Sequence, residues 1–230
     1  MATAHEARDE CAVTSPSVKI AILIFEKLTA LDAIGPYEVL SRLPGADLDF
    51  VAPEAGIKRT DTGRLGLEAT KSIDELTDPD IVLIPGGEGN RPLLEDDRVL
   101  HWVRGAHETS TWTTSVCTGS LVLGAAGILE GKRATSHWVY RDSLAEYGAE
   151  PVAQRVVEDG KVITAAGVAA GIDMALHLAG RVAGDEVAQA IQLGIEYDPD
   201  PPHDAGSPEK APEHLVELIR GLESAAVEGS

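Results

Sequence analysis

The stretch VKIAILIF at residues 18–25 decides the fold class, because it is a nearly continuous apolar run of strand length. Runs of this kind are typical of strands that are buried on both faces of a parallel sheet. A second run, DIVLIP, follows at residues 80–85, and shorter strands are predicted at 47–52 and 112–116. Segments with helical periodicity separate these strands. The alternation predicts an α/β fold with a mainly parallel sheet sandwiched by helices.

The rest of the chain extends this alternation. We expect Thr29 to cap the first helix and Gly35-Pro36 to kink or break it. Length and the absence of an internal repeat predict one domain over residues 18–225, after a flexible arm at 1–17. The other predicted elements are helices at 29–43, 91–109, 118–129, 138–148, 171–181, 185–197 and from Ser207-Pro208 onward, a hairpin at 58–70, a short strand at 134–135, and a strand pair at 155–158 and 162–165.

The composition excludes several classes of partner. The chain has 19 basic and 38 acidic side chains among 230 residues, a formal net charge of −19. No basic face is available to neutralise phosphates, so nucleic acid and anionic membrane surfaces are excluded. The sequence has no apolar run long enough for a membrane span, and residues 1–17 do not resemble a signal peptide. Two cysteines, Cys11 and Cys117, are too few for a disulfide framework. These features predict a cytoplasmic protein.

Residues 113–120 (TTSVCTGS) hold the strongest chemical signal, because a strand ends, Cys117 lies on the turn and a small-residue helix begins. This arrangement is typical of a nucleophile elbow, which exposes the nucleophile above the sheet. The dipole of the following helix is expected to lower the pKa of the thiol, and the Thr118 amide to bind a developing negative charge. The alternative is a buried structural cysteine. Cys11, on the predicted arm, carries no such signal.

Several other residues are expected near this turn, because the carboxyl ends of parallel strands meet at one edge of a sheet. Asp32 lies in the first turn of its helix, where it is either a functional acid or only a partner of the helix dipole. The turn at 85–89 (PGGEG) fails the dinucleotide and phosphate-loop patterns and is interpreted as bringing bare amides close to a ligand. His137 either touches the site or packs in the core, and the turn at 167–171 (GVAAG) either approaches the sulfur or only packs closely. No histidine has metal-ligand spacing.

Together these segments resemble the ThiJ/PfpI superfamily, over residues 18–222. The segments that carry the resemblance are LDAIGPYE (31–38), PGG (85–87), SVCTG (115–119), ATSHW (134–138) and GVAAGID (167–173). IEYDPDPP at 195–202 and AGSP at 205–208 point to the isonitrile hydratase branch. The resemblance implies a flavodoxin-like sheet of the class I glutamine amidotransferase type. Thr118 stands where the family's proteases carry His, which argues against peptide hydrolysis, and Asp32 stands where many members carry Glu.

The resemblance implies a hydratase without metal or organic cofactor that converts an isonitrile, R–N≡C, to an N-substituted formamide. Cys117 is then the nucleophile, and Asp32 protonates the terminal carbon and later activates water, by way of a covalent thioimidate. The Thr118 hydroxyl is expected to orient Asp32. The residues expected to bind the substrate, the sulfur or the developing charge are Thr118, Gly87, Val168 and His137.

Two other functions stay open at this point. One is different cysteine chemistry on small electrophiles, such as glyoxal hydration or the repair of glycated groups. The other is a redox-sensing or ligand-binding module without turnover. In either case a homodimer is expected, because the superfamily usually dimerises and the last predicted helix carries an apolar stripe from Leu215 to Leu222.

Overall fold

Seven strands form the central sheet of the computed structural model, which describes residues 17–228 and side chains as far as Glu223. Six are parallel, and β10 pairs antiparallel with β11 at one edge. The strands, in spatial order, are β10 (Val156–Asp159), β11 (Val162–Ala165), β7 (Trp112–Val116), β6 (Ile81–Ile84), β1 (Val18–Leu23), β2 (Ala46–Ala52) and β5 (Lys71–Ser72). The predicted arm, apart from residue 17, lies outside the described residues, and so does Cys11.

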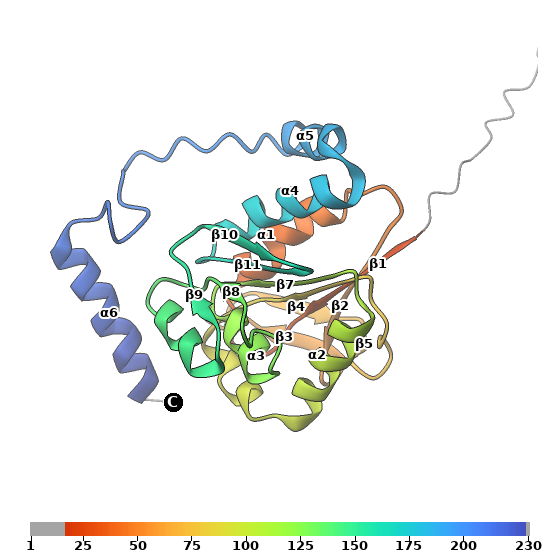
Figure 1. Ribbon diagram of the computed structural model, residues 1–230, viewed down its shortest axis with the longest axis horizontal. Helices are drawn as coiled ribbons and strands as arrows, with labels where there is room; N and C mark the ends of the chain where they lie inside the picture. Colours follow the sequence, from red (N-terminus) through yellow and green to blue (C-terminus); the bar gives the residue numbers. More distant parts are fainter. Residues whose placement is uncertain (1–16, 229–230) are drawn as a thin grey trace, which may run out of the picture.

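Helices cover both faces of this sheet (Figure 1). On one face α1 (Ala30–Leu40) packs against α4 (Ala170–Ala183), which in turn contacts α5 (Asp185–Gly194). On the other face lie α2 (Asp97–Thr109) and α3 (Gly119–Ala125). The centres of the apolar runs that predicted the fold are buried between these layers, since every residue of β6 is buried and Ile20 to Leu23 of β1 have no exposed surface. The predicted α/β sandwich is confirmed.

Short elements occupy the periphery. The predicted hairpin is β3 (Gly56–Arg59) with β4 (Gly66–Ala69). The short strand β8 (Arg133–Ala134) pairs with β9 (Glu150–Pro151). The helix predicted at 138–148 is a 3₁₀ helix over Arg141–Tyr147. The one predicted at 91–109 is a 3₁₀ turn, Pro92–Leu94, followed by α2, and a further 3₁₀ turn, Glu88–Asn90, precedes it.

Helix α1 continues through Gly35-Pro36, so of the predicted kink or break, the break is wrong. The reason is tertiary packing: a Cβ on Gly35 would lie 3.0 Å from Ile172 Cγ1 of α4, so the two helices are closely apposed at this point. Thr29 occupies the N-cap position, but its hydroxyl donates to Asp61 Oδ2 at 3.3 Å and makes no capping bond. Packing against α4 therefore maintains α1 where local sequence signals predict an interruption.

The last helix, α6 (Glu213–Glu228), begins later than predicted at Ser207-Pro208. Residues 207–211 form a turn in which the Ser207 carbonyl accepts from the amides of Lys210 and Ala211. Pro212 disfavours helical backbone at the residue before it, which stops that turn from running into α6. In Figure 1 α6 follows a long extended connection and stands at the side of the sheet.

The order of the strands gives the molecule one switch point. From β1 the chain passes through α1 to β2 on one side, whereas β6 and β7 lie on the other side. Ligand sites of open α/β sheets form at the carboxyl ends of the strands beside such a point. The loops after β1, β6, β7 and β11 meet there. Among the described residues no helix has the length and apolar character needed to cross a membrane, and the compartment stays a prediction.

Candidate active site

Cys117 lies on a strained turn between β7 and α3. Its φ of 57° is in the left-handed region, which costs a residue other than glycine about 1–3 kcal/mol unless its surroundings enforce it. Here they do so. The Cys117 amide donates to the carbonyls of Ala165 and Ala166, and its carbonyl accepts from the hydroxyls of Ser120 (3.1 Å) and Ser136 (3.0 Å). This is the geometry of the predicted nucleophile elbow.

The helix after the elbow starts in contact with the neighbouring strand. A Cβ on Gly119 would lie 2.0 Å from the carbonyl oxygen of Ile84 at the end of β6, so only glycine fits. We expect Gly119→Ala to lower the free energy of unfolding by about 3 kcal/mol, because α3 would have to move away from β6. The measurement is urea denaturation.

Gly105→Ala is the matched control for this change. Gly105 lies inside α2, and a Cβ there would meet no atom within 4 Å. Alanine should be neutral there or stabilise the protein by about 0.5–1 kcal/mol, since glycine is a poor residue in a helix interior. Equal effects of the two substitutions would contradict the predicted close contact at Gly119.

Asp32 is fully buried at the start of α1. The Gly86 amide donates to Oδ2 at 2.9 Å, and Oδ1 makes no hydrogen bond of ordinary geometry within the described residues. The carboxyl also interacts with the Cys117 thiol. Burial raises the pKa of Asp32 from 3.8 to about 7, although the Gly86 amide and the thiol favour the charged form. Near neutral pH the carboxyl is therefore ready either to give or to take a proton.

Cys117 is buried, and the pKa of its thiol is raised, mainly by burial and next by the charge of the Asp32 carboxylate. The expectation that the pKa of this thiol is lowered overall is wrong. The Thr118 and Val168 amides do hydrogen-bond to the sulfur and favour thiolate, but burial outweighs them. Cys117 and Asp32 are thus a coupled pair in which the thiol holds its proton at rest.

The predicted binding residues lie around this pair in different roles. The Gly87 amide donates to Thr118 Oγ1 at 3.1 Å and not to the sulfur, and Asn90 Nδ2 donates to the Thr118 carbonyl at 2.8 Å. The Thr118 hydroxyl therefore accepts a hydrogen bond from the Gly87 amide. Among the described contacts, it makes no hydrogen bond to Asp32. Gly86 has no room for a side chain, since its Cβ would lie 2.6 Å from the Thr118 amide and 2.9 Å from Asp32 Oδ2.

A cavity of about 640 Å³ opens above the thiol. Its lining includes Cys117, Thr118, Gly87, Val168 and His137, all predicted to lie at the site. The pKa of His137 is lowered by burial, so the imidazole is neutral near pH 7. The structure thus brings together at one cavity the residues that the sequence analysis singled out, with Asp32 in contact with the thiol.

Three further residues maintain this arrangement, and the sequence analysis assigned none of them its role at the thiol. Gly86 supplies the amide that fixes Asp32, Asn90 holds the carbonyl of Thr118, and Ser136 holds the carbonyl of Cys117. The glycine pair at 86–87 was a usable signal, because bare amides were expected there. Asn90 and Ser136 carry no signal in a single sequence, since only the tertiary structure brings them to the elbow.

Comparison with known proteins identifies the family of this chain. The model of the DJ-1/PfpI family matches residues 18–181. Isonitrile hydratase of Pseudomonas putida is 45% identical over 204 residues, 89% of each chain. A ThiJ/PfpI family protein from Pseudomonas syringae superposes with a TM-score of 0.89 at 35% identity, covering 99% of this chain and 95% of that one. DJ-1beta of Drosophila melanogaster shares the fold, with a TM-score of 0.72 at 21% identity over 80% of this chain and 100% of its own. The predicted resemblance is confirmed, and the chain belongs to the DJ-1/PfpI family.

Proposed function

We propose that this protein hydrates isonitriles to N-substituted formamides at Cys117 and Asp32. The observation that carries the proposal is the contact of the thiol with a carboxyl whose pKa is about 7, at a cavity large enough for an organic molecule. An isonitrile carbon must accept both a nucleophile and a proton, and this pair supplies both at one place. The 45% identity to an isonitrile hydratase supports this choice of substrate class.

The first step adds the thiol across the isonitrile carbon. The active pair holds one proton, shared between sulfur and carboxyl. Asp32 takes this proton as the sulfur forms a bond to carbon, and the same carboxyl gives the proton to that carbon. The product is a thioimidate, R–N=CH–S–Cys117, and Asp32 is again a carboxylate. The Thr118 and Val168 amides stabilise negative charge on the sulfur during the attack.

The second step is hydrolysis of the thioimidate. Asp32 removes a proton from water as the hydroxyl oxygen bonds to carbon, and it passes this proton to the nitrogen. The resulting R–NH–CH(OH)–S–Cys117 then collapses: the C–S bond breaks, the hydroxyl proton returns through Asp32 to the sulfur, and R–NH–CHO leaves. Every proton moves through one carboxyl, and the cycle balances without a metal or an organic cofactor. That the reaction needs neither stays a prediction. His137 and Gly87 are proposed to bind substrate, as residues of the cavity lining.

The test is direct incubation of the protein with cyclohexyl isonitrile, following formation of N-cyclohexylformamide by chromatography. We expect formamide to accumulate with multiple turnovers. Glyoxal is the second substrate in the same assay. Formation of hydroxyacid from glyoxal, with no formamide from the isonitrile, would replace our proposal by the aldehyde chemistry considered above.

We also propose that the protein is a homodimer. The apolar stripe of α6 stays exposed in one copy: Leu218 is 55% exposed and Leu222 is 59% exposed. An exposed apolar patch of this kind favours association. Light scattering at micromolar concentration should give twice the chain mass of 24.2 kDa. A mass that stays at the single-chain value would contradict the dimer.

A further inference from the structure

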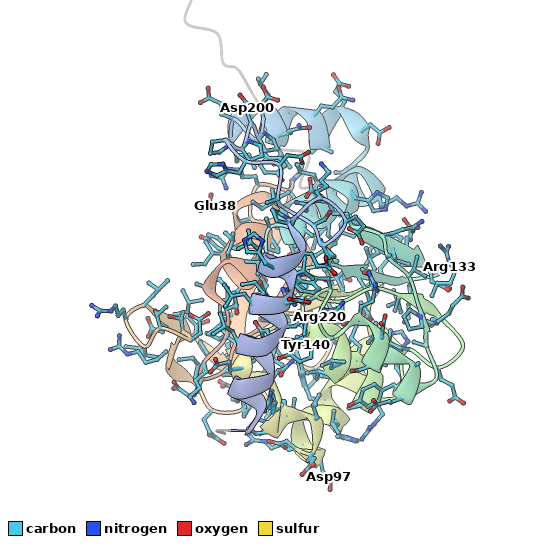
Figure 2. The ribbon with its side chains drawn as sticks, turned by 90° about the vertical axis from the view of Figure 1, so that its left-hand side faces the viewer. Glu38, Asp97, Arg133, Tyr140, Asp200 and Arg220 are labelled. Atoms are coloured by element: carbon cyan, nitrogen blue, oxygen red, sulfur yellow. The ribbon has the colours of Figure 1, made fainter. Side chains whose placement is uncertain are left out.

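The last helix approaches the cavity of Cys117 from outside the sheet. Two contacts attach it to the segment that follows His137. Tyr140 Oη donates to Glu223 Oε2 at 2.8 Å, and the Arg220 guanidinium lies 5.4 Å from the centre of the Trp138 ring. Figure 2 shows Tyr140 and Arg220 together at α6. Burial and the bond to Glu223 raise the pKa of Tyr140 to about 12, in keeping with a phenol that keeps its proton in this hydrogen bond.

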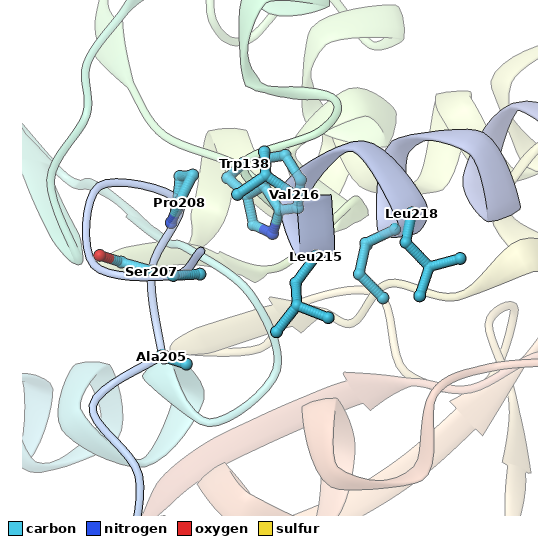
Figure 3. Close-up of a pocket in the computed structure, with 10 residues that line it drawn as sticks. Trp138, Ala205, Ser207, Pro208, Leu215, Val216 and Leu218 are labelled. Atoms are coloured by element: carbon cyan, nitrogen blue, oxygen red, sulfur yellow. The ribbon is translucent and has the colours of Figure 1, made fainter. Parts of the chain in front are cut away.

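Leu222 and Glu223 of α6 line the same cavity as Cys117, although they lie more than a hundred residues away in the sequence. The other leucines of the stripe have a different position. Leu215 and Leu218 line a separate hollow of about 260 Å³ with Trp138 and Pro208 (Figure 3). Both precede Leu222 along α6. Within one copy of the chain, Leu222 is therefore the member of the apolar stripe that is exposed and also lines the cavity of the thiol.

The geometry of an isonitrile sets what Leu222 can contact. The R–N≡C group is linear, so once its carbon reaches the sulfur, R extends away from the floor of the cavity. A methyl group ends close to the nitrogen, whereas a cyclohexyl ring extends several bond lengths further from the sulfur. We propose that α6 forms this outer wall and that Leu222 is a specificity-determining residue that packs against R. This inference rests on the proposed isonitrile hydration.

The test is the ratio of kcat/KM for cyclohexyl isonitrile to kcat/KM for methyl isonitrile. Leu222→Ala should lower this ratio about 10-fold, the effect of losing apolar contact with one substrate and not with the other. Leu222→Met keeps an apolar side chain of similar volume and should retain most of the ratio. Tyr140→Phe removes the bond to Glu223 and should lower the ratio about 3-fold, because α6 is then held less firmly.

Leu218→Ala is the matched control, since Leu218 is on the same helix, is similarly exposed and does not line this cavity. Its ratio should equal that of the wild type. An unchanged ratio in Leu222→Ala, or an equal fall in Leu218→Ala, would overturn the role of Leu222 while formamide formation by the wild type still stands. A wild type that forms formamide from neither isonitrile would overturn the proposed function, and this assignment with it.

Discussion

Cys117→Ser should reduce formamide formation by about 10⁴-fold or more, as expected for loss of the nucleophile in a concerted unit. Serine keeps the shape of the turn, but its hydroxyl is a far weaker acid than a thiol. Asp32, with a pKa of about 7, cannot remove that proton to a useful extent. Cys117→Ala should be equally inactive. The measurement is the initial rate of N-cyclohexylformamide formation at pH 8.

Unfolding of the two variants shows whether the loss of activity is a loss of the nucleophile or a loss of the fold. Cys117 contributes its backbone to the hydrogen bonds with Ser120 and Ser136, and neither variant changes those bonds. Both variants should therefore unfold cooperatively, as the wild type does. Retention of a tenth of the wild-type rate by a folded Cys117→Ala would mean that water attacks the isonitrile directly, with no covalent intermediate.

Asp32→Asn should lower kcat/KM by at least about 10²-fold, the contribution of a well-placed acid or base. Asparagine can still accept a hydrogen bond from the Gly86 amide, but it cannot carry a proton between sulfur, carbon and water. Combined with Cys117→Ala it should add little further loss, because the two residues act as one unit. Glu38→Gln is the matched control, an exposed acid on the same helix that pairs with Arg42, and it should keep the wild-type rate.

The pH profile separates a catalytic Asp32 from a structural one. Below pH 7 the pair holds two protons and Asp32 cannot take the proton of the thiol, so kcat/KM of the wild type should rise with pH through about 7. The residual kcat/KM of Asp32→Asn should not rise with pH in this range. A wild-type profile that is flat from pH 5 to 9, or wild-type turnover in Asp32→Asn, would make Asp32 an ordinary acid at a helix start.

Stability should change in the opposite direction to activity in the same variant. The pKa of Asp32 is higher in the folded protein than its ordinary 3.8, so its favourable contribution is complete below that value and is lost as pH rises through about 7. Asp32→Asn removes the cost of burying a charge and should stabilise the protein at pH 8 by up to about 4 kcal/mol. A thermal melt of the two proteins at pH 8 measures this gain and also shows that the variant is folded.

The parts of the fold that the sequence predicted correctly are those with a strong local cause. The run at 18–25 is apolar on both faces and became a strand with two neighbours, and TTSVCTGS carries the strand, turn and helix of the elbow within eight residues. The wrong predictions have a tertiary cause. Gly35-Pro36 does not break α1 because α4 packs beside it, and Ser207-Pro208 does not start α6 because Pro212 intervenes.

In the candidate site too, the features with a local cause in the sequence were predicted and those that depend on tertiary structure were not. Asp32, Cys117 and Val168 were expected together because strand ends meet at one edge of a sheet, and the structure places them there. The pKa of the thiol was predicted in the wrong direction because a helix start can be recognised in the sequence, whereas complete burial of the sulfur cannot. The position of Leu222 at the cavity could not be predicted from the sequence either, since it depends on contacts between α6 and the segment after His137.

The central claim is that the thiol of Cys117 forms a bond to the isonitrile carbon. The measurement that tests it most directly is mass spectrometry of the protein during its first turnover, mixed with cyclohexyl isonitrile and quenched with acid at a series of times. We expect the peptide that contains Cys117 to gain the full mass of the isonitrile, because addition of the thiol loses no atoms, and then to lose it as formamide appears. Formamide that appears during the first turnover with the Cys117 peptide unmodified at every time would contradict the covalent route.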